Sequence, residues 1–289
     1  MGALAMAASP SVAAQSPVPA APHIVVTSPI LGAVVSDLVG DGATVTVLMG
    51  NGVDPHDWSP SAQDVEAVHH ADLVVANGLG LEAGLDDALA EAAAGGVPVF
   101  EATDHIAVRT LGEGEGEGDA GGAADPHFWT DPLAMRDVVV ALGPVVQGLG
   151  IDVTTRLPDL TTRLEALDTE VRAILDVVPP ERRELVTGHE SMGYFADRYG
   201  FQLIGAVVPS LSSQGEVSAS QLSAIAAAIR EHGVPAIFTE IGTPQAVVDA
   251  IAAETGVQVV QLPSHNLPED GSYLTFIRDI ATAIAGALT

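Results

Sequence analysis

Short apolar runs alternate with amphipathic segments along most of the chain, and this rhythm constrains the fold more than any other feature. Each run is typical of a buried strand, and the segment after it has the apolar spacing of a helix. Strands are expected at residues 24–28, 44–49, 73–76, 97–101, 184–187, 203–208, 236–239 and 257–262. Alternating strands and helices form parallel sheets, which predicts the α/β class. Ligands of such sheets bind at the carboxyl ends of the strands.

One longer helical segment interrupts this rhythm. Between residues 153 and 175, apolar side chains recur every three or four residues, which is typical of one buried helix face. The length of 289 residues exceeds what one core usually holds, since single cores stop growing at about 250–300 residues. We therefore predict two α/β lobes joined by a long linker helix. Their boundaries are 23–152 for the first lobe, 153–178 for the linker and 179–289 for the second lobe.

Charge and N-terminal composition limit the possible partners and location. The chain has 38 acidic and 10 basic residues, a formal charge of −28, and this surface repels the phosphates of nucleic acid. It has no cysteine, which excludes thiolate zinc sites and disulfides. Residues 1–22 are rich in Ala, Ser and Pro, as in the later part of a secretory signal followed by a spacer. Export is the prediction, and a disordered N-terminus is the alternative.

The tripeptide Asp-Pro-His occurs twice, and both copies are followed by Trp two residues after the histidine. The histidines are His56 and His127, and a third, His189, follows the strand at 184–187. A single loop histidine is more often a surface residue, and His189 could instead cap the next helix. The repeated pattern favours metal ligands, because imidazole is the commonest protein ligand for transition metals. We predict one metal site built from these three rings.

A carboxylate would complete a tetrahedral zinc site with three imidazoles. The candidates are Asp270, Glu269 and Glu240, and spacing alone does not rank them. Glu240 follows a strand, while Asp270 precedes the last helix, where aspartate also serves as an N-cap. The other histidines are assigned no role: His23 in the spacer, His69 and His70 on an exposed helix face, and the isolated His105, His232 and His265.

Several motifs together resemble the zinc- and manganese-specific solute-binding proteins of ABC importers, the cluster A-I family. The resemblance covers residues 23–289. It rests on segments 52–56, 71–74, 77–82, 125–132, 187–195, 238–240 and 271–274.

The resemblance implies two lobes with the metal held in the cleft between them. His56 and His127 would come from the first lobe, and His189 and an acidic residue before the last helix from the second. That acid maps best to Asp270, with Glu269 one residue away as the alternative. Histidine at position 189 is typical of zinc-type members, so the predicted cargo is Zn(II). The resemblance also implies an ABC permease as partner, a monomer, no enzyme activity, and a place in the periplasm or at the outer face of the cytoplasmic membrane.

One segment departs from the family pattern. Many zinc importers have a His-rich loop before the second ligand, but segment 111–124 of this chain is rich in Gly and Glu and has no histidine. We interpret it as a solvated linker. Its composition resembles the AztC-like subset, which a separate metallochaperone loads.

Other functions remain as alternatives. The chain could be a manganese-binding importer protein or a surface adhesin. A zinc-dependent hydrolase is a further alternative, since three histidines with an open position can activate water. The absence of a His-Glu-x-x-His motif argues against it. Because ligand histidines must be neutral, metal affinity is expected to fall below about pH 6.

Overall fold

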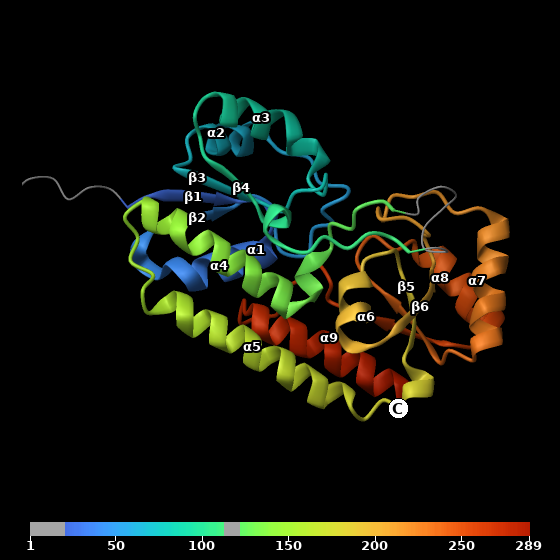
Figure 1. Ribbon diagram of the computed structural model, residues 1–289. Coiled ribbons are helices and arrows are strands. Elements are labelled where there is room, and N and C mark those ends of the chain that lie inside the picture. The colour runs from blue at the N-terminus through green and yellow to red at the C-terminus, as the bar shows by residue number, and fades with distance from the viewer. Residues whose placement is uncertain (1–20, 113–121) are drawn as a thin grey trace, which may run out of the picture.

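The computed structural model describes residues 21–112 and 122–289, which contain two parallel four-stranded sheets (Figure 1). The first sheet has the order β2-β1-β3-β4, and the second β6-β5-β7-β8. The strands of the first sheet are β1 (His23–Val26), β2 (Thr44–Val47), β3 (Leu73–Ala76) and β4 (Val99–Glu101). Those of the second are β5 (Glu184–Thr187), β6 (Gln202–Ala206), β7 (Ala236–Thr239) and β8 (Gln258–Gln261). The predicted α/β class with two lobes is confirmed. The first 20 residues, most of the signal-like segment, and residues 113–121 of the acidic segment lie outside the described residues.

Helices cover both faces of the first sheet. Strand side chains alternate between the two faces, so that Val26 packs with one set of helices and Val25 with the other. The first set is α1 (Pro29–Val39) and α4 (Pro132–Gly148), and the second is α2 (Ala62–His69) and α3 (Asp86–Ala94). In Figure 1, α2 and α3 lie above this sheet, and α1 and α4 lie below it.

The second sheet repeats this arrangement. Val186 and Ile237 pack against α7 (Ala219–His232) and α8 (Gln245–Thr255). Leu185 and Phe238 point to the opposite face, which is covered by α6 (Gly193–Tyr199) and α9 (Tyr273–Leu288). Both lobes therefore bring the carboxyl ends of four parallel strands to one edge.

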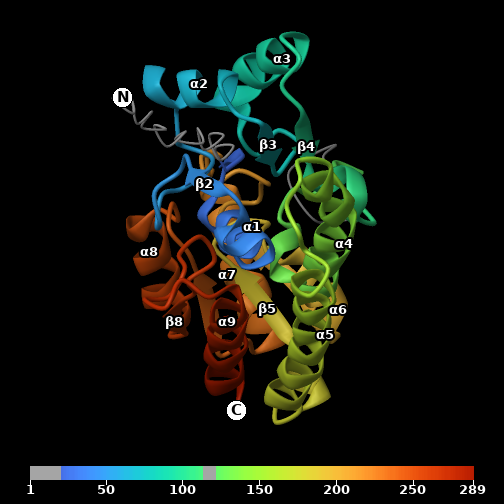
Figure 2. The ribbon, with the colours of Figure 1, turned by 90° about the vertical axis from the view of Figure 1, so that its left-hand side faces the viewer.

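Helix α5 (Arg156–Leu175) is the long helix that the apolar spacing predicts (Figure 2). It runs beside α9 and α4, and its stripe of leucines and valines is buried. The resulting core is continuous across the molecule, because it contains residues of both sheets, such as Ile24 and Leu185, together with α5 and α9. Since packed interiors are dense and transmit strain, this shared core opposes hinge motion between the lobes.

Side-chain caps fix where the helices begin. Ser61 and Asp64 form the capping box that the sequence predicts, with Ser61 Oγ accepting from the Asp64 amide and the Asp64 carboxylate accepting from the Ser61 amide. Asp131 caps α4 by accepting from the Leu133 amide at 2.8 Å. Among the described helices, none combines the length and the apolarity that crossing a bilayer would require.

Replacing Leu164 with alanine should destabilise the whole molecule. Leu164 lies on the buried face of α5 with no exposed surface, so truncation leaves a cavity in the shared core. We expect a loss of about 2–5 kcal/mol in the free energy of unfolding, measured by urea denaturation. The matched control is Thr162→Ala on the exposed face of the same helix, which should stay within about 0.5 kcal/mol of the parent. Equal effects of the two changes would contradict the role of α5 in the core.

Candidate metal centre

The structure brings the three histidines singled out by the sequence to one point between the lobes. His127 Nε2 lies 3.2 Å from His56 Nε2 and 3.2 Å from His189 Nε2. The centroids of the three rings are 5.0–5.3 Å apart. A tetrahedral zinc ion with Zn–N bonds of about 2.0–2.1 Å holds its ligand nitrogens about 3.3 Å apart. The three rings therefore have the spacing of ligands around one divalent ion.

In two of the three rings, a neighbouring carboxylate determines which nitrogen carries the proton. His127 Nδ1 donates to Asp125 Oδ1 at 2.8 Å, and His189 Nδ1 donates to Glu240 Oε1. With the proton on Nδ1, the Nε2 atom of each ring presents a lone pair. Two lone pairs facing each other across 3.2 Å repel, and a cation between them removes the repulsion. The contact between His127 and His189 therefore suits a shared cation rather than a hydrogen bond between the two rings.

The two Asp-Pro-His segments use the same local device to aim their histidines. Asp54 Oδ1 accepts from the His56 amide at 3.0 Å, and Asp125 Oδ1 accepts from the His127 amide at 2.9 Å. The intervening proline has a fixed φ and no N–H, so the carboxylate reaches over it to the histidine amide. These aspartates therefore shape their own turns and aim the histidines that follow them.

His189 and Glu240 meet because they follow neighbouring strands. His189 comes two residues after β5, Glu240 directly follows β7, and these strands pair in the second sheet. Glu240 Oε1 also accepts from the His189 amide at 2.8 Å. Gly188 makes this approach possible, because a Cβ at that position would lie 2.7 Å from Glu240 Oε1 and 2.2 Å from Thr243 Oγ1. Glu240, one of the carboxylates considered from the sequence, therefore orients the His189 ring through its Oε1 atom.

Contacts from several elements fix the loop that carries His127. Asn77 Nδ2 donates to the carbonyl oxygen of Pro126 at 3.0 Å, and the Asn77 amide donates to the buried Glu82. From the second lobe, the Tyr194 hydroxyl donates to the Asp125 carbonyl oxygen at 3.1 Å. The motif at residues 77–82, quoted above for the family resemblance, thus supports the metal centre without touching it.

Further polar contacts join the lobes next to the cluster. Arg198 on α6 forms an ion pair with Asp131, with the shortest N···O distance at 2.6 Å. The Ser213 hydroxyl donates to Asp54 Oδ2 at 2.5 Å. The loops that carry His56 and His127 are therefore both anchored to the second lobe.

Burial keeps the rings of His56 and His127 neutral, the form in which imidazole binds metal. Burial, together with the neighbouring His127 and His189, lowers the pKa of His56 to about 3. Burial also holds the pKa of His127 well below its ordinary value. Burial raises the pKa of Asp125 to about 6, which still leaves this carboxyl mostly ionised at neutral pH.

The structure does not bring Asp270 into the cluster. Its side chain is exposed at the start of α9, where it accepts from the Ser272 amide at 2.9 Å and from the Thr275 hydroxyl at 2.7 Å. Among the described residues, the group of possible ligands that lies within 4.8 Å contains only the three histidines. Glu269 is exposed as well. The structure therefore places the Asp270 carboxylate at its own helix start and away from the three histidines.

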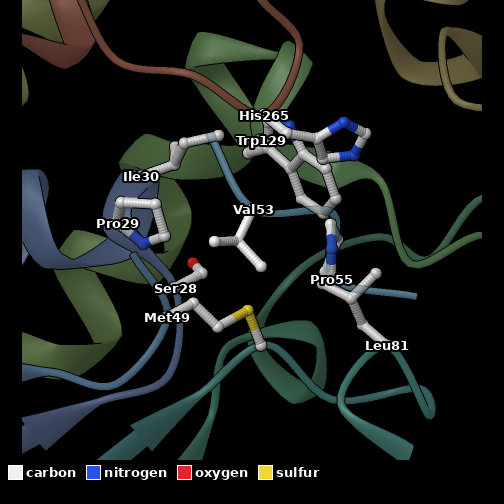
Figure 3. A pocket seen from close by; sticks show the side chains of 9 residues that line it. All are labelled: Ser28, Pro29, Ile30, Met49, Val53, Pro55, Leu81, Trp129 and His265. Atoms are coloured by element: carbon white, nitrogen blue, oxygen red, sulfur yellow. The ribbon is translucent and has the colours of Figure 1, made fainter. Parts of the chain in front are cut away.

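His265, which the sequence analysis left without a role, lies beside the cluster. It is buried, and its ring centroid is 5.9 Å from that of His189 and 6.4 Å from that of His56. Figure 3 shows it next to Trp129 at the edge of a pocket between the lobes. The sequence does contain one indication of this place: His265 follows β8, at the same sheet edge as His189. The other histidines lie elsewhere; His232 contacts Glu184, for example, and His105 stacks on Phe100.

Comparison with known proteins gives consistent matches over nearly the whole chain. A family model described as "Zinc-uptake complex component A periplasmic" matches residues 24–287. The zinc-binding protein TroA of Treponema pallidum is 31% identical over 247 residues, which are 83% of this chain and 78% of TroA. The manganese-binding lipoprotein MntA of Halalkalibacterium halodurans is 28% identical over 243 residues, which are 82% of this chain and 76% of MntA. The solved structure of the Treponema pallidum protein has a TM-score of 0.81 at 29% identity and covers 93% of this chain and 99% of that one.

Zinc affinity should depend less on pH than the sequence suggested. Protonation of one ligand histidine with an ordinary pKa lowers the apparent zinc affinity of a protein about tenfold between pH 7.5 and pH 5.5. Two such histidines would lower it about 100-fold. Because the pKa values of His56 and His127 are lowered, both rings remain neutral across this range. Asp125, whose pKa is about 6, loses part of its charge over the same range and accounts for a smaller decrease. We expect a decrease of at most about tenfold, measured by chelator competition at constant ionic strength. A decrease of 100-fold or more would contradict the neutral, buried state of these rings.

Replacing Asp270 with alanine should leave zinc affinity nearly unchanged. The carboxylate is exposed and bound to Ser272 and Thr275, so its removal affects the start of α9. We expect a change of no more than about twofold in the dissociation constant, as for other surface substitutions. Titration calorimetry measures it, and a loss of tenfold or more would restore Asp270 as a ligand.

Proposed function

The chain belongs to the family of periplasmic zinc-uptake components, and from this membership we propose that it is an extracytoplasmic solute-binding protein for Zn(II). It captures the ion between its lobes and delivers it to the permease of an ABC importer. His56, His127 and His189 are the proposed ligands. One observation carries the proposal: two ring nitrogens with assigned lone pairs and a third ring nitrogen meet at zinc-like distances.

The ligand chemistry supports zinc over manganese. Imidazole nitrogen suits zinc, whereas manganese prefers carboxylate and other oxygen ligands. The carboxylates nearest the cluster, Asp125 and Glu240, bind the far nitrogens of the rings. Relatives are named for either metal, TroA for zinc and MntA for manganese. The proposal of zinc therefore rests on the nitrogen donors of this chain.

The carboxylates also supply the charge that a divalent ion needs. Neutral imidazoles do not compensate a charge of two, but each anionic partner makes its ring a stronger donor. Asp125 and Glu240 are buried with the rings, where the interaction is weakly screened. The lobes share one core, so capture requires little rearrangement, and the rings are organised before the ion arrives.

A zinc hydrolase is the competing function. It would need an open coordination position for water and a general base close to that water. Asp125 and Glu240, the carboxylates that contact the ligand rings, orient them and are not placed as bases. Ester and phosphate hydrolysis by the zinc-loaded protein is the assay that separates the two functions, and turnover lost in His127→Ala would favour the enzyme.

Alanine in place of His56, His127 or His189 should weaken zinc binding strongly. Each change removes one of the three proposed ligands, and we expect the dissociation constant to rise by about 100-fold or more in titration calorimetry. The control is His70→Ala, an exposed histidine at the end of α2, which should bind like the parent. Unchanged affinity in all three variants, with folding intact by circular dichroism, would refute the site.

A further inference from the structure

We propose that His265 is the fourth metal ligand, so that the site binds its ion with four imidazoles and no carboxylate. The proposal rests on the proposed function, since it completes the same centre. It also assigns to His265 a part in choosing zinc over manganese.

The first argument is the unpaired nitrogen of a buried ring. His265 is 4% exposed, and its Nε2 atom is buried without a hydrogen-bond partner. Its Nδ1 atom lies 3.2 Å from the Ser264 hydroxyl oxygen. When Nδ1 carries the proton and donates to Ser264, Nε2 presents a lone pair, as in His127 and His189. Buried polar atoms are nearly always paired, so an orphan beside three converging imidazoles points to a ligand.

The second argument is that the loops carrying His56 and His127 also hold the segment that carries His265. Trp129, two residues after His127, donates its indole N–H to the Ser264 carbonyl oxygen at 3.0 Å. Asn51, on the loop that leads to His56, exchanges two hydrogen bonds with the Leu267 backbone, at 2.7 and 2.9 Å. The position of His265 is therefore fixed on both sides by the elements that place the ligands of the first lobe.

The third argument is topological. In the order β6-β5-β7-β8, His189 follows β5, Glu240 follows β7 and His265 follows β8 at the same edge of the sheet. Parallel strands deliver the residues after their carboxyl ends to one place, which is why such edges bind ligands. The second lobe thus offers two imidazoles to the centre, matching the two from the first lobe.

The distance that separates His265 from full coordination is small. Its ring centroid lies 5.9 Å from that of His189 and 6.4 Å from that of His56, whereas the three clustered rings are 5.0–5.3 Å apart. A side-chain shift of roughly 1 Å, common on binding, closes this difference. The ring borders the pocket also lined by Val53, Pro55 and Leu81, which leaves room for the movement (Figure 3).

Four neutral imidazoles bind a divalent ion only if negative charge lies nearby. Asp125 and Glu240 provide it through His127 and His189, so no carboxylate oxygen has to enter the coordination shell. A shell of four nitrogens is favourable for zinc and poor for manganese. His265 therefore excludes the oxygen donor that manganese would use.

The test compares His265→Ala and His265→Asp with the full-length parent, using Zn²⁺ and Mn²⁺ as probes. His265→Ala should weaken zinc binding about 10–100-fold. His265→Asp should recover most of the zinc affinity and strengthen manganese binding at least about tenfold over the parent. The matched control is His232→Ala, which removes a histidine paired with Glu184 far from the site and should change neither affinity.

A direct count of ligand rings keeps the test independent of variant folding. In the zinc-bound parent, histidine ring NMR should show four Nε2 nitrogens shifted to metal-bound values. Three shifted rings, together with unchanged zinc affinity in His265→Ala, would overturn the role of His265 and leave the proposed function intact. Failure of the parent itself to bind zinc would instead overturn the proposed function.

Discussion

Two buried carboxylates fix the direction of two imidazole rings, and the rest of the centre depends on this constraint. Asp125 and Glu240 each take the proton-bearing nitrogen of a ring and turn the other nitrogen toward its neighbour. The facing lone pairs of His127 and His189, 3.2 Å apart, are unfavourable without a cation. Such arrangements persist only where the surrounding packing compels them, and they mark functional sites because the unfavourable contact is relieved on binding.

The fold supplies that packing through one core shared by both lobes. Each sheet directs its strand ends toward the seam, and helices α5 and α9 bind the sheets together from the opposite side. The ligands come from different lobes, so their spacing would vary if the lobes could hinge freely. Because a dense interior resists such motion, the distances among the rings of His56, His127 and His189 are set before metal binds. Cross-lobe contacts, such as the ion pair of Arg198 with Asp131, add the same restraint at the site itself.

The sequence predicted the elements and the three converging histidines because their signals are local. Apolar periodicity identified the strands and the helix that is α5, and the repeated Asp-Pro-His pattern drew attention to two loops. The role proposed for His265 was not predictable in this way. Asp270 has the right chemistry, but its carboxylate is satisfied by Ser272 and Thr275 within five residues. The burial of His265 depends on Trp129, whose indole N–H donates to the carbonyl oxygen of Ser264. These two residues are 135 positions apart, and no local pattern reveals such a contact.

Selectivity has to come from the ligands, because the charge of the chain cannot provide it. A formal charge of −28 attracts every cation, and salt screens that attraction beyond about 8–10 Å. Inside the site the screening is lost, and the type of donor atom decides which ion is held. The three rings differ in access: His127 and His189 are fully buried, whereas His56 is partly exposed beside the pocket formed by Val53 and Pro55. An ion arriving from solvent therefore meets the already neutral rings of His56 and His127. Behind the rings, Asp125 Oδ1 and Glu240 Oε1 are already engaged by the Nδ1 atoms of His127 and His189.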